Sequence, residues 1–141
     1  MSSYICKDTD SITEKIIGAA YEVGITLGYG FLEKVYENSL AVELKSRGLS
    51  VECQKPVKVY YKNTIVGDYI IDLLVENKIV VELKSVKILT DIHKAQLCNY
   101  LVATKKQIGL LINFGGNKVE IKRVFNDKIN LSEKSVQSVT N

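Results

Sequence analysis

Asp72, Glu82 and Lys84 are the residues of this sequence whose types and spacing best suit chemistry. They lie in two runs rich in β-branched and aliphatic residues, 69–75 and 79–84, which predict two strands. Two carboxylates a few ångströms apart repel each other unless a proton or a cation lies between them. An acidic pair on adjacent strands, with an ammonium group beside it, therefore suggests a site for a divalent metal ion.

A single polar break, Glu76-Asn77-Lys78, separates the two runs and predicts a hairpin turn. A turn centred on Asn77 places Asp72 directly opposite Glu82, and opposed Cβ atoms lie about 5 Å apart. Lys84 shares that face because side chains alternate with a period of two. The other face is expected to pack on a core because it carries only apolar residues, namely Ile71, Leu73, Val75, Ile79, Val81 and Leu83.

Hydrophobic periodicity and capping residues predict the helices that surround this hairpin. They are expected from a capping box at Ser11 to the Gly28-Tyr29-Gly30 turn, from near Phe31 to Gly48, and from Thr90 or Asp91 to about Thr104. The second helix carries an apolar stripe with a four-residue repeat of Leu32, Tyr36, Leu40 and Leu44. The third is expected to pack through Ala95, Cys98, Leu101 and Val102.

Further alternating or apolar runs predict the remaining strands. They are expected over 51–61, from Ile65 into the hairpin, over 108–112, and from Val119 to about Val124. Pro56 predicts that the first of these lies at an edge or a bulge, because proline cannot donate to a ladder. The resulting order, α-α-β-β-β-α-β-β, predicts an α/β fold with a mixed sheet.

The composition is that of an ordinary globular protein. With 141 residues, 46% apolar and 25% charged, the chain is expected to form one domain over residues 1–125 and a polar, weakly ordered tail over 126–141. A net charge of +3 is compatible with a polyanionic partner without indicating one. The sequence shows neither a signal peptide nor an apolar run long enough for a membrane span, so a soluble cytoplasmic protein is expected.

The three cysteines, Cys6, Cys53 and Cys98, are widely separated and lack C-x-x-C spacing. An odd number without such spacing argues against a disulfide framework, a zinc knuckle and a four-cysteine iron–sulfur cluster. We therefore expect reduced, buried thiols.

Two motifs resemble known nuclease families. Asp72 followed by Glu82-Leu83-Lys84 reads D-x9-E-x-K, and with Gln96 and Tyr100 as Q-x3-Y it resembles the PD-(D/E)XK nuclease superfamily, most closely its RecB-like branch. The segment 30–36 reads G-x-x-E-x-x-Y and resembles the signature of the GxxExxY family within that superfamily. The resemblance extends over residues 12–125, with one departure, since an isoleucine stands where the superfamily has a proline before the first acid.

The resemblance implies a restriction-endonuclease-like αβββαβ core with a central mixed β-sheet flanked by helices. It implies that Asp72 and Glu82 bind Mg²⁺ or Mn²⁺ together with the Leu83 backbone carbonyl and water. It further implies that Lys84 orients or deprotonates the attacking water and offsets charge on the phosphate. Glu33 is implied as a further metal ligand, either directly or through water.

The same resemblance implies residues around this centre. Gln96 and Tyr100 share a helix face and would face the site, contacting nucleic acid or the metal ligands. His93 lies one turn earlier and could join them. Tyr36 lies on the apolar stripe of its helix and is expected in the core first, with its hydroxyl seeking a polar partner such as a site residue.

Several of these residues also have a purely structural interpretation. E-x-K on a strand is often a solvated surface pair, and an acid such as Glu33 near a helix N-terminus is often there because of the helix dipole. Lysines 87, 94, 105 and 106 could follow phosphates, although a solvated face is the simpler interpretation.

Three functions are compatible with the sequence. The favoured one is a metal-dependent nuclease hydrolysing phosphodiester bonds of DNA, with a homo-oligomer or a protein partner supplying specificity. The alternative is a nuclease-fold module that binds nucleic acid or a partner with weak or no cleavage. The third is a metal-dependent hydrolase of a smaller phosphate compound.

Overall fold

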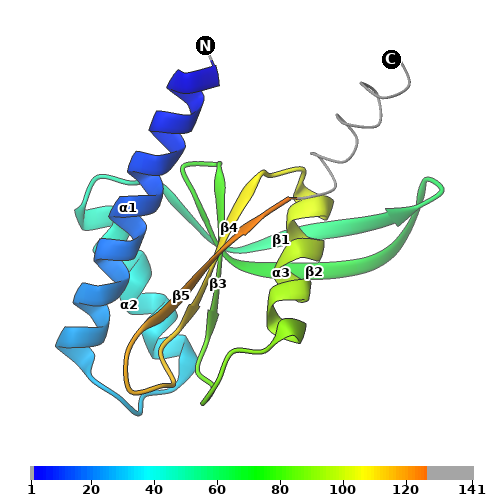
Figure 1. Cartoon of the computed structure of the whole chain (residues 1–141). Coiled ribbons are helices and arrows are strands. Elements are labelled where there is room, and N and C mark those ends of the chain that lie inside the picture. The colour runs from blue at the N-terminus through cyan, green and yellow to red at the C-terminus, as the bar shows by residue number, and fades with distance from the viewer. Residues whose placement is uncertain (1, 127–141) are drawn as a thin grey trace.

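The computed structural model describes residues 2–126, with side chains described from residue 9 onward. A five-stranded mixed sheet in the order β1-β2-β3-β4-β5 forms its centre (Figure 1). Its elements are α1 (Ser2–Leu27), α2 (Glu33–Ser46), β1 (Val51–Tyr61), β2 (Thr64–Val75), β3 (Ile79–Lys84), α3 (Asp91–Thr104), β4 (Ile108–Asn113) and β5 (Glu120–Phe125). The order and the α/β class are those predicted from the sequence.

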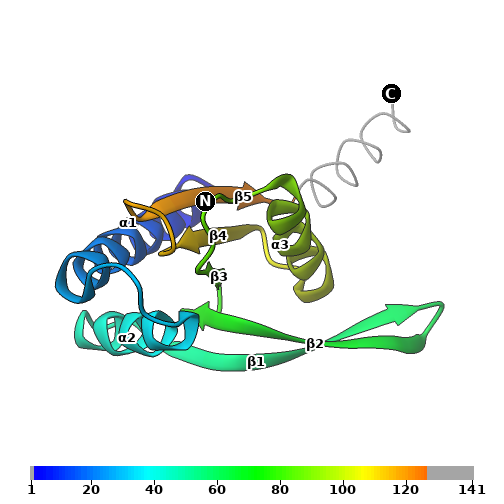
Figure 2. The ribbon, with the colours of Figure 1, turned by 90° about the horizontal axis from the view of Figure 1, so that it is seen from below.

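Helices cover the two faces of the sheet unequally. Figure 2 shows α1 and α2 on one side of strands β3 and β4 and α3 on the other. β3 pairs in parallel with β4, from Ile79 opposite Ile108 to Lys84 opposite Asn113, and antiparallel with β2. Every residue of β3 is buried except Lys84, which is half-buried. A charged residue within such a strand needs a partner or a function, because burying an unpaired charge is costly.

Two apolar cores lie on the two faces of the sheet. The first joins α1 and α2 to Leu73, Val75, Val81 and neighbouring residues of the sheet. The second joins α3 to the opposite face. Ile71 was expected beside Leu73 but lies in the second core. The pairing of β2 with β3 stops at Leu73, so the preceding part of β2 is free to follow the twist of β1 instead.

The packing face of α3 agrees with the predicted stripe at Cys98 and Leu101 and differs from it at Ala95 and Val102. Leu97, Tyr100 and Leu101 are the buried residues of this helix, whereas Ala95 and Val102 are exposed. The i, i+3 and i+4 spacing of the buried residues is that of one helix face. Leu97 sits over Gly109 of β4, where a Cβ would come within 2.9 Å of its Cδ1, so this glycine permits the close approach of α3.

The first helix is longer than predicted. It begins at Ser2 and not at Ser11. Thr13, expected in the first turn, donates its hydroxyl to the Thr9 carbonyl oxygen at 2.8 Å, which is a bond between two turns of a continuous helix. Residues 2–11 contain neither glycine nor proline, so nothing in them stops the helix.

The β1–β2 hairpin extends beyond the sheet. Its turn has left-handed residues at Lys62 and Asn63, with φ of 47° and 65°, which matches the twist of tight hairpins. Both views show its outer part, residues 58–69, reaching past α3 (Figures 1 and 2). We call this part the arm. Its pairing runs only within the hairpin, because β2 pairs with β3 over residues 73–75 alone.

Three further features bear on the sequence predictions. Asn126 was expected to begin the tail, but it is buried. Its side-chain amide donates to the carbonyl oxygens of Leu101 at 3.1 Å and Lys106 at 2.9 Å. The rest of the predicted tail, residues 127–141, lies outside the described part. Cys53 and Cys98 are free thiols, but Cys53 is exposed and not buried as predicted. Within residues 2–126, no helix combines the length and apolar character needed to cross a bilayer.

Candidate active site

Asp72 and Glu82 lie where strands β2 and β3 separate. The last paired residues of the two strands are Leu73 and Val81. One residue further, the Asp72 N–H donates to Glu82 Oε1 at 2.8 Å, and the Leu83 N–H donates to Asp72 Oδ2 at 2.8 Å. The two carboxylates thus replace ladder bonds across the widening gap and face each other as the hairpin register predicts. Glu82 is only 6% exposed, so it does not point into solvent.

Strand β1 is irregular at the same level. Gln54 lies between the pairs Cys53–Leu73 and Lys55–Ile71, opposite Asp72, and has a φ of 54°. A left-handed residue other than glycine within a strand is strained, and such residues gather at functional sites. Strand pairing is therefore disturbed on both sides of Asp72.

A third acid, Glu37 of α2, lies beside Asp72 and was missed in the sequence. It is only 4% exposed, and its Oε2 accepts hydrogen bonds from Lys34 Nζ at 2.6 Å and from Gln54 Nε2 at 2.8 Å. A sequence signal for it exists. It precedes the buried residues Ala41 and Leu44 by four and seven positions, so an acid occupies the apolar face of this helix.

The acids disturb one another's ionisation. Burial, followed by the charge of Asp72, raises the pKa of Glu82 from 4.5 to about 8. Burial also raises the pKa of Asp72 from 3.8 to about 6, with further contributions from Glu37 and Glu33. Negative charge at this fork, the place where Asp72 and Glu82 face each other between β2 and β3, is therefore undercompensated. Glu82 holds a proton at neutral pH unless a cation joins the pair.

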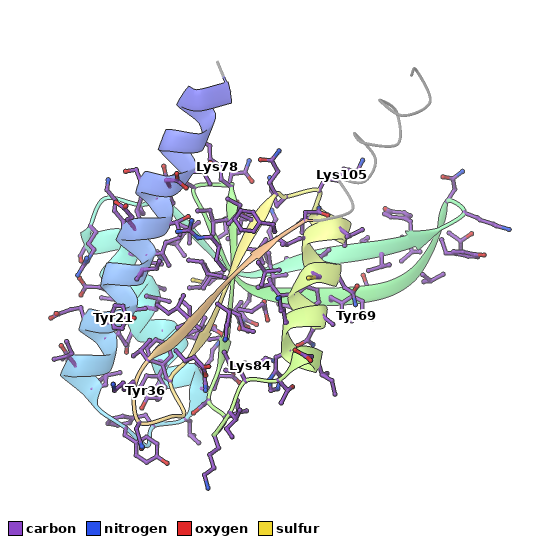
Figure 3. All side chains as sticks on the ribbon, viewed as in Figure 1. Tyr21, Tyr36, Tyr69, Lys78, Lys84 and Lys105 are labelled. Carbon is purple, nitrogen blue, oxygen red and sulfur yellow. The ribbon has the colours of Figure 1, made fainter. Side chains whose placement is uncertain are left out.

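Lys84, Gln96 and Tyr100 form a chain of hydrogen bonds from β3 to α3. Lys84 Nζ donates to Gln96 Oε1 at 3.1 Å, and Gln96 Nε2 donates to the Tyr100 hydroxyl at 3.1 Å. The helical spacing of the last two residues predicts that they share a face, and the structure directs that face toward the lysine. Figure 3 shows Lys84 at the lower end of the sheet, between α2 and α3.

The structure places Glu33 near the acids and gives His93 a capping contact. Glu33 is the first residue of α2, not the third as expected, and is exposed, yet its charge contributes to the raised pKa values of both Asp72 and Glu82. His93 uses Nδ1 to accept the N–H of Thr90 at 3.1 Å, so its observed contact is a cap of α3.

Tyr36 belongs to the core under the α1–α2 connection. It is only 1% exposed, and its ring stacks on Phe114 with centroids 4.6 Å apart. Its hydroxyl donates to the Gly28 carbonyl oxygen at 2.6 Å and accepts the Phe31 N–H at 3.2 Å. The polar partners of the Tyr36 hydroxyl are thus backbone groups of the α1–α2 connection. The sequence had suggested a site residue as one possible partner.

Tyr36→Phe is expected to lower the free energy of unfolding by about 1–2 kcal/mol, because the Gly28 carbonyl and the Phe31 N–H lose their partner. Catalytic or binding activity, once measured, should change less than about twofold, since the ring still packs on Phe114. Urea denaturation beside an activity assay checks both. A large loss of activity at unchanged stability would instead place the hydroxyl in the site.

The donor set at the fork suits a hard divalent cation. Each of the two carboxylates uses one oxygen for a backbone N–H, so Asp72 Oδ1 and Glu82 Oε2 are not taken by those bonds. Oxygen ligands from carboxylates are those that Mg²⁺ prefers, with water completing its shell. Among the described residues, no group of three His, Cys, Asp or Glu side chains is arranged to hold a metal ion.

Comparison with solved structures supports the fold. A chain described as "Crystal structure of SSO0001" is similar, with a TM-score of 0.56 at 16% sequence identity. The match covers 74% of this chain and 57% of that chain, so this chain spans little more than half of its length. At this identity the similarity shows the fold alone. A search of curated proteins found no match.

Comparison with family models is more specific. The model described as the PD-(D/E)XK nuclease superfamily matches residues 10–124. This segment is most of the chain and contains both acids of the fork, Lys84, and the Gln96–Tyr100 pair. The mixed five-stranded sheet with helices on both faces is consistent with the restriction-endonuclease-like core of that superfamily. On these findings, the chain belongs to the PD-(D/E)XK nuclease superfamily.

Proposed function

We propose that this protein is a metal-dependent nuclease that hydrolyses phosphodiester bonds of DNA, and that it belongs to the GxxExxY family of the RecB-like branch. The observation that carries the proposal is the fork between β2 and β3. There the half-buried Asp72 and the buried Glu82 each accept a backbone N–H of the opposite strand at 2.8 Å, and Lys84 of β3 is held by Gln96. Superfamily membership supports hydrolysis of nucleic acid by such a group.

The acids would bind the cation that such nucleases generally use. Asp72 and Glu82 would hold Mg²⁺ or Mn²⁺ with the Leu83 carbonyl, and Glu33 would act directly or through water. When bound, a divalent ion polarises the phosphate and lowers the pKa of coordinated water. The backbone N–H groups of Asp72 and Leu83 keep the two carboxylates aimed at the gap between the strands.

Lys84 would act on the attacking water and on the phosphate. Its Nζ is held at 3.1 Å by Gln96, so the ammonium group has a defined position at the end of β3. From there it can orient the water and offset the charge that grows on the phosphate oxygens in the transition state. Gln96 is in turn held by the Tyr100 hydroxyl. The role of α3 would therefore be to position Lys84 and not to contact the reacting atoms.

Metal-dependent cleavage by the purified chain tests this proposal. End-labelled linear DNA, circular DNA, single-stranded DNA and RNA are incubated with Mg²⁺, with Mn²⁺, or with EDTA. We expect cleavage of DNA with either metal and none with EDTA. Calcium serves as a control, because it binds oxygen ligands yet holds them in a larger, looser shell.

Two results would contradict the proposal. Cleavage that persists in EDTA would exclude the metal-dependent mechanism. Binding of DNA without any cleavage, with log affinity falling linearly with log salt, would indicate a binding module that has kept the nuclease fold.

A further inference from the structure

A groove of about 740 Å³ runs between α3 and the arm. Its walls come from Lys58 and Tyr60 of β1, from Tyr69 of β2, from one face of α3 that includes Asn99, and from Lys105 directly after that helix. A pocket of this size holds a drug-sized molecule, which corresponds to roughly two nucleotides. The groove lies outside the acidic fork, and the chemistry proposed above uses only Gln96 and Tyr100 of its lining.

The groove offers exposed aromatic faces. Tyr69 is 47% exposed and Tyr60 is 60% exposed. The Tyr69 ring rests against Tyr100, with centroids 5.6 Å apart, and over Gly67, where a Cβ would lie 3.2 Å from ring atom Cε2. The ring is therefore held in place from two sides while part of it stays open to a ligand. A positioned tyrosine ring of this kind is a platform on which a base can stack.

The charge of the groove favours an anion. Its lining, all of it within the described residues, contains Lys58 and Lys105 and no acidic side chain. Lys58 pairs with Asp68 at 3.1 Å, but both side chains are more than half exposed. Exposed ion pairs of this kind are weak, so a phosphate can compete for the lysine.

The groove is linked to the fork through the hydrogen bond between Gln96 and Lys84. Gln96 and Tyr100 line the groove, and Gln96 also accepts the hydrogen bond from Lys84. In Figure 3, Tyr69 lies beside α3 on the arm, Lys105 lies at the far end of that helix, and Lys84 lies near its beginning. A chain laid along the groove would therefore lead from Lys105 past Tyr69 toward the two carboxylates.

We propose that this groove binds single-stranded nucleic acid and guides it to the Asp72–Glu82 fork. Bases would stack on Tyr69 and Tyr60, and Lys58 and Lys105 would contact phosphates. Single strands fit because their bases can leave the stack and present a face to a tyrosine, whereas duplex bases cannot. The inference deepens the proposed nuclease function and rests on it for the direction of the strand, although binding itself can be measured without cleavage.

Binding in EDTA separates the groove from catalysis. Fluorescence anisotropy with oligo-dT and oligo-U of roughly 12 nucleotides, and with a duplex of equal length, gives the affinity of each form. We expect tighter binding of the single strands than of the duplex. The two single strands show whether the groove prefers DNA or RNA.

Matched variants test the residues. Tyr69→Leu is expected to weaken binding of oligo-dT about fivefold or more, because one stacking platform is lost. Lys105→Gln should weaken binding and make the salt dependence less steep by about 0.7, the value for one phosphate contact on a single strand. The controls are Tyr21→Leu, which changes an equally exposed tyrosine of α1, and Lys78→Gln in the β2–β3 turn; neither residue lines the groove. Both should bind like the unmodified protein.

Three outcomes would overturn the groove proposal. One is binding by Tyr69→Leu that equals that of Tyr21→Leu, and another is duplex binding as tight as that of single strands. The third is a protein that binds no nucleic acid but loses self-association in Tyr69→Leu, measured by analytical ultracentrifugation, which would make the groove a protein interface. If the unmodified protein cleaves DNA and Tyr69→Leu binds single strands as well as it does, the groove proposal alone is refuted. If Tyr69→Leu weakens binding but the unmodified protein does not cleave, the nuclease function alone is refuted.

Discussion

Glu82→Gln is expected to reduce metal-dependent cleavage by about 10³-fold or more, which corresponds to about 4 kcal/mol of transition-state stabilisation. The amide retains the shape of the side chain and an oxygen that can accept the Asp72 N–H, so the fork keeps its geometry. What disappears is the negative charge that a divalent cation needs. Asp72→Asn should have a comparable effect, since its amide oxygen can still accept the Leu83 N–H.

Single-turnover cleavage of end-labelled DNA measures this effect, and circular dichroism checks the fold. Glu14→Gln is the matched control, because it neutralises an exposed acid on α1, and it should cleave at the unmodified rate. Activity of Glu82→Gln above about one tenth of the unmodified rate would mean that the fork does not bind the catalytic metal.

Glu82→Gln is also expected to make the metal-free protein more stable than the unmodified protein at high pH. The raised pKa values mean that folded Glu82 and Asp72 keep protons that the unfolded chain releases. Unfolding therefore releases protons, and stability falls as pH rises from about 4 to about 8. Below that range both states are protonated and the stabilising contribution is complete; above it the folded protein carries two buried charges and the contribution is lost.

Glu82→Gln removes one of these charges. In EDTA at about pH 9, we expect its melting temperature to exceed that of the unmodified protein by roughly 5 °C, equivalent to about 1–2 kcal/mol for a domain of this size. At about pH 4 the difference should disappear, because Glu82 is then neutral in both folded and unfolded states. Melting curves across this pH range provide the measurement.

Metal gives an independent control for this prediction. Because Mg²⁺ requires deprotonated carboxylates, it should raise the melting temperature of the unmodified protein at high pH and have little effect on Glu82→Gln. A variant that loses activity while gaining stability is the signature of a functional site that is costly to the fold. If Glu82→Gln is less stable than the unmodified protein at every pH, then Glu82 serves the fold and the electrostatic account of the fork is wrong.

The opposition of Asp72 and Glu82 was readable in the sequence because it depends on local geometry. A short turn centred on Asn77 sets the register of the hairpin, and counting outward from it brings the two acids together. The pairing of Gln96 with Tyr100 follows in the same way from the repeat of one helix. The sequence alone also determined the order of the elements and the mixed sheet, since each element has its own periodicity and boundaries.

Only the tertiary structure decided how these elements meet. Glu37 lies beside Asp72 because α2 packs against β1 and β3, and the left-handed backbone of Gln54 directs an amide to Glu37. The groove exists because the arm reaches past α3, and Tyr69 meets Tyr100 only there. The predicted packing face of α3 was wrong at Ala95 and Val102 for the same reason. Hydrogen bonding along one strand pair or one helix follows from local spacing, whereas contacts between layers depend on which faces pack and at what angle, and that depends on the whole core.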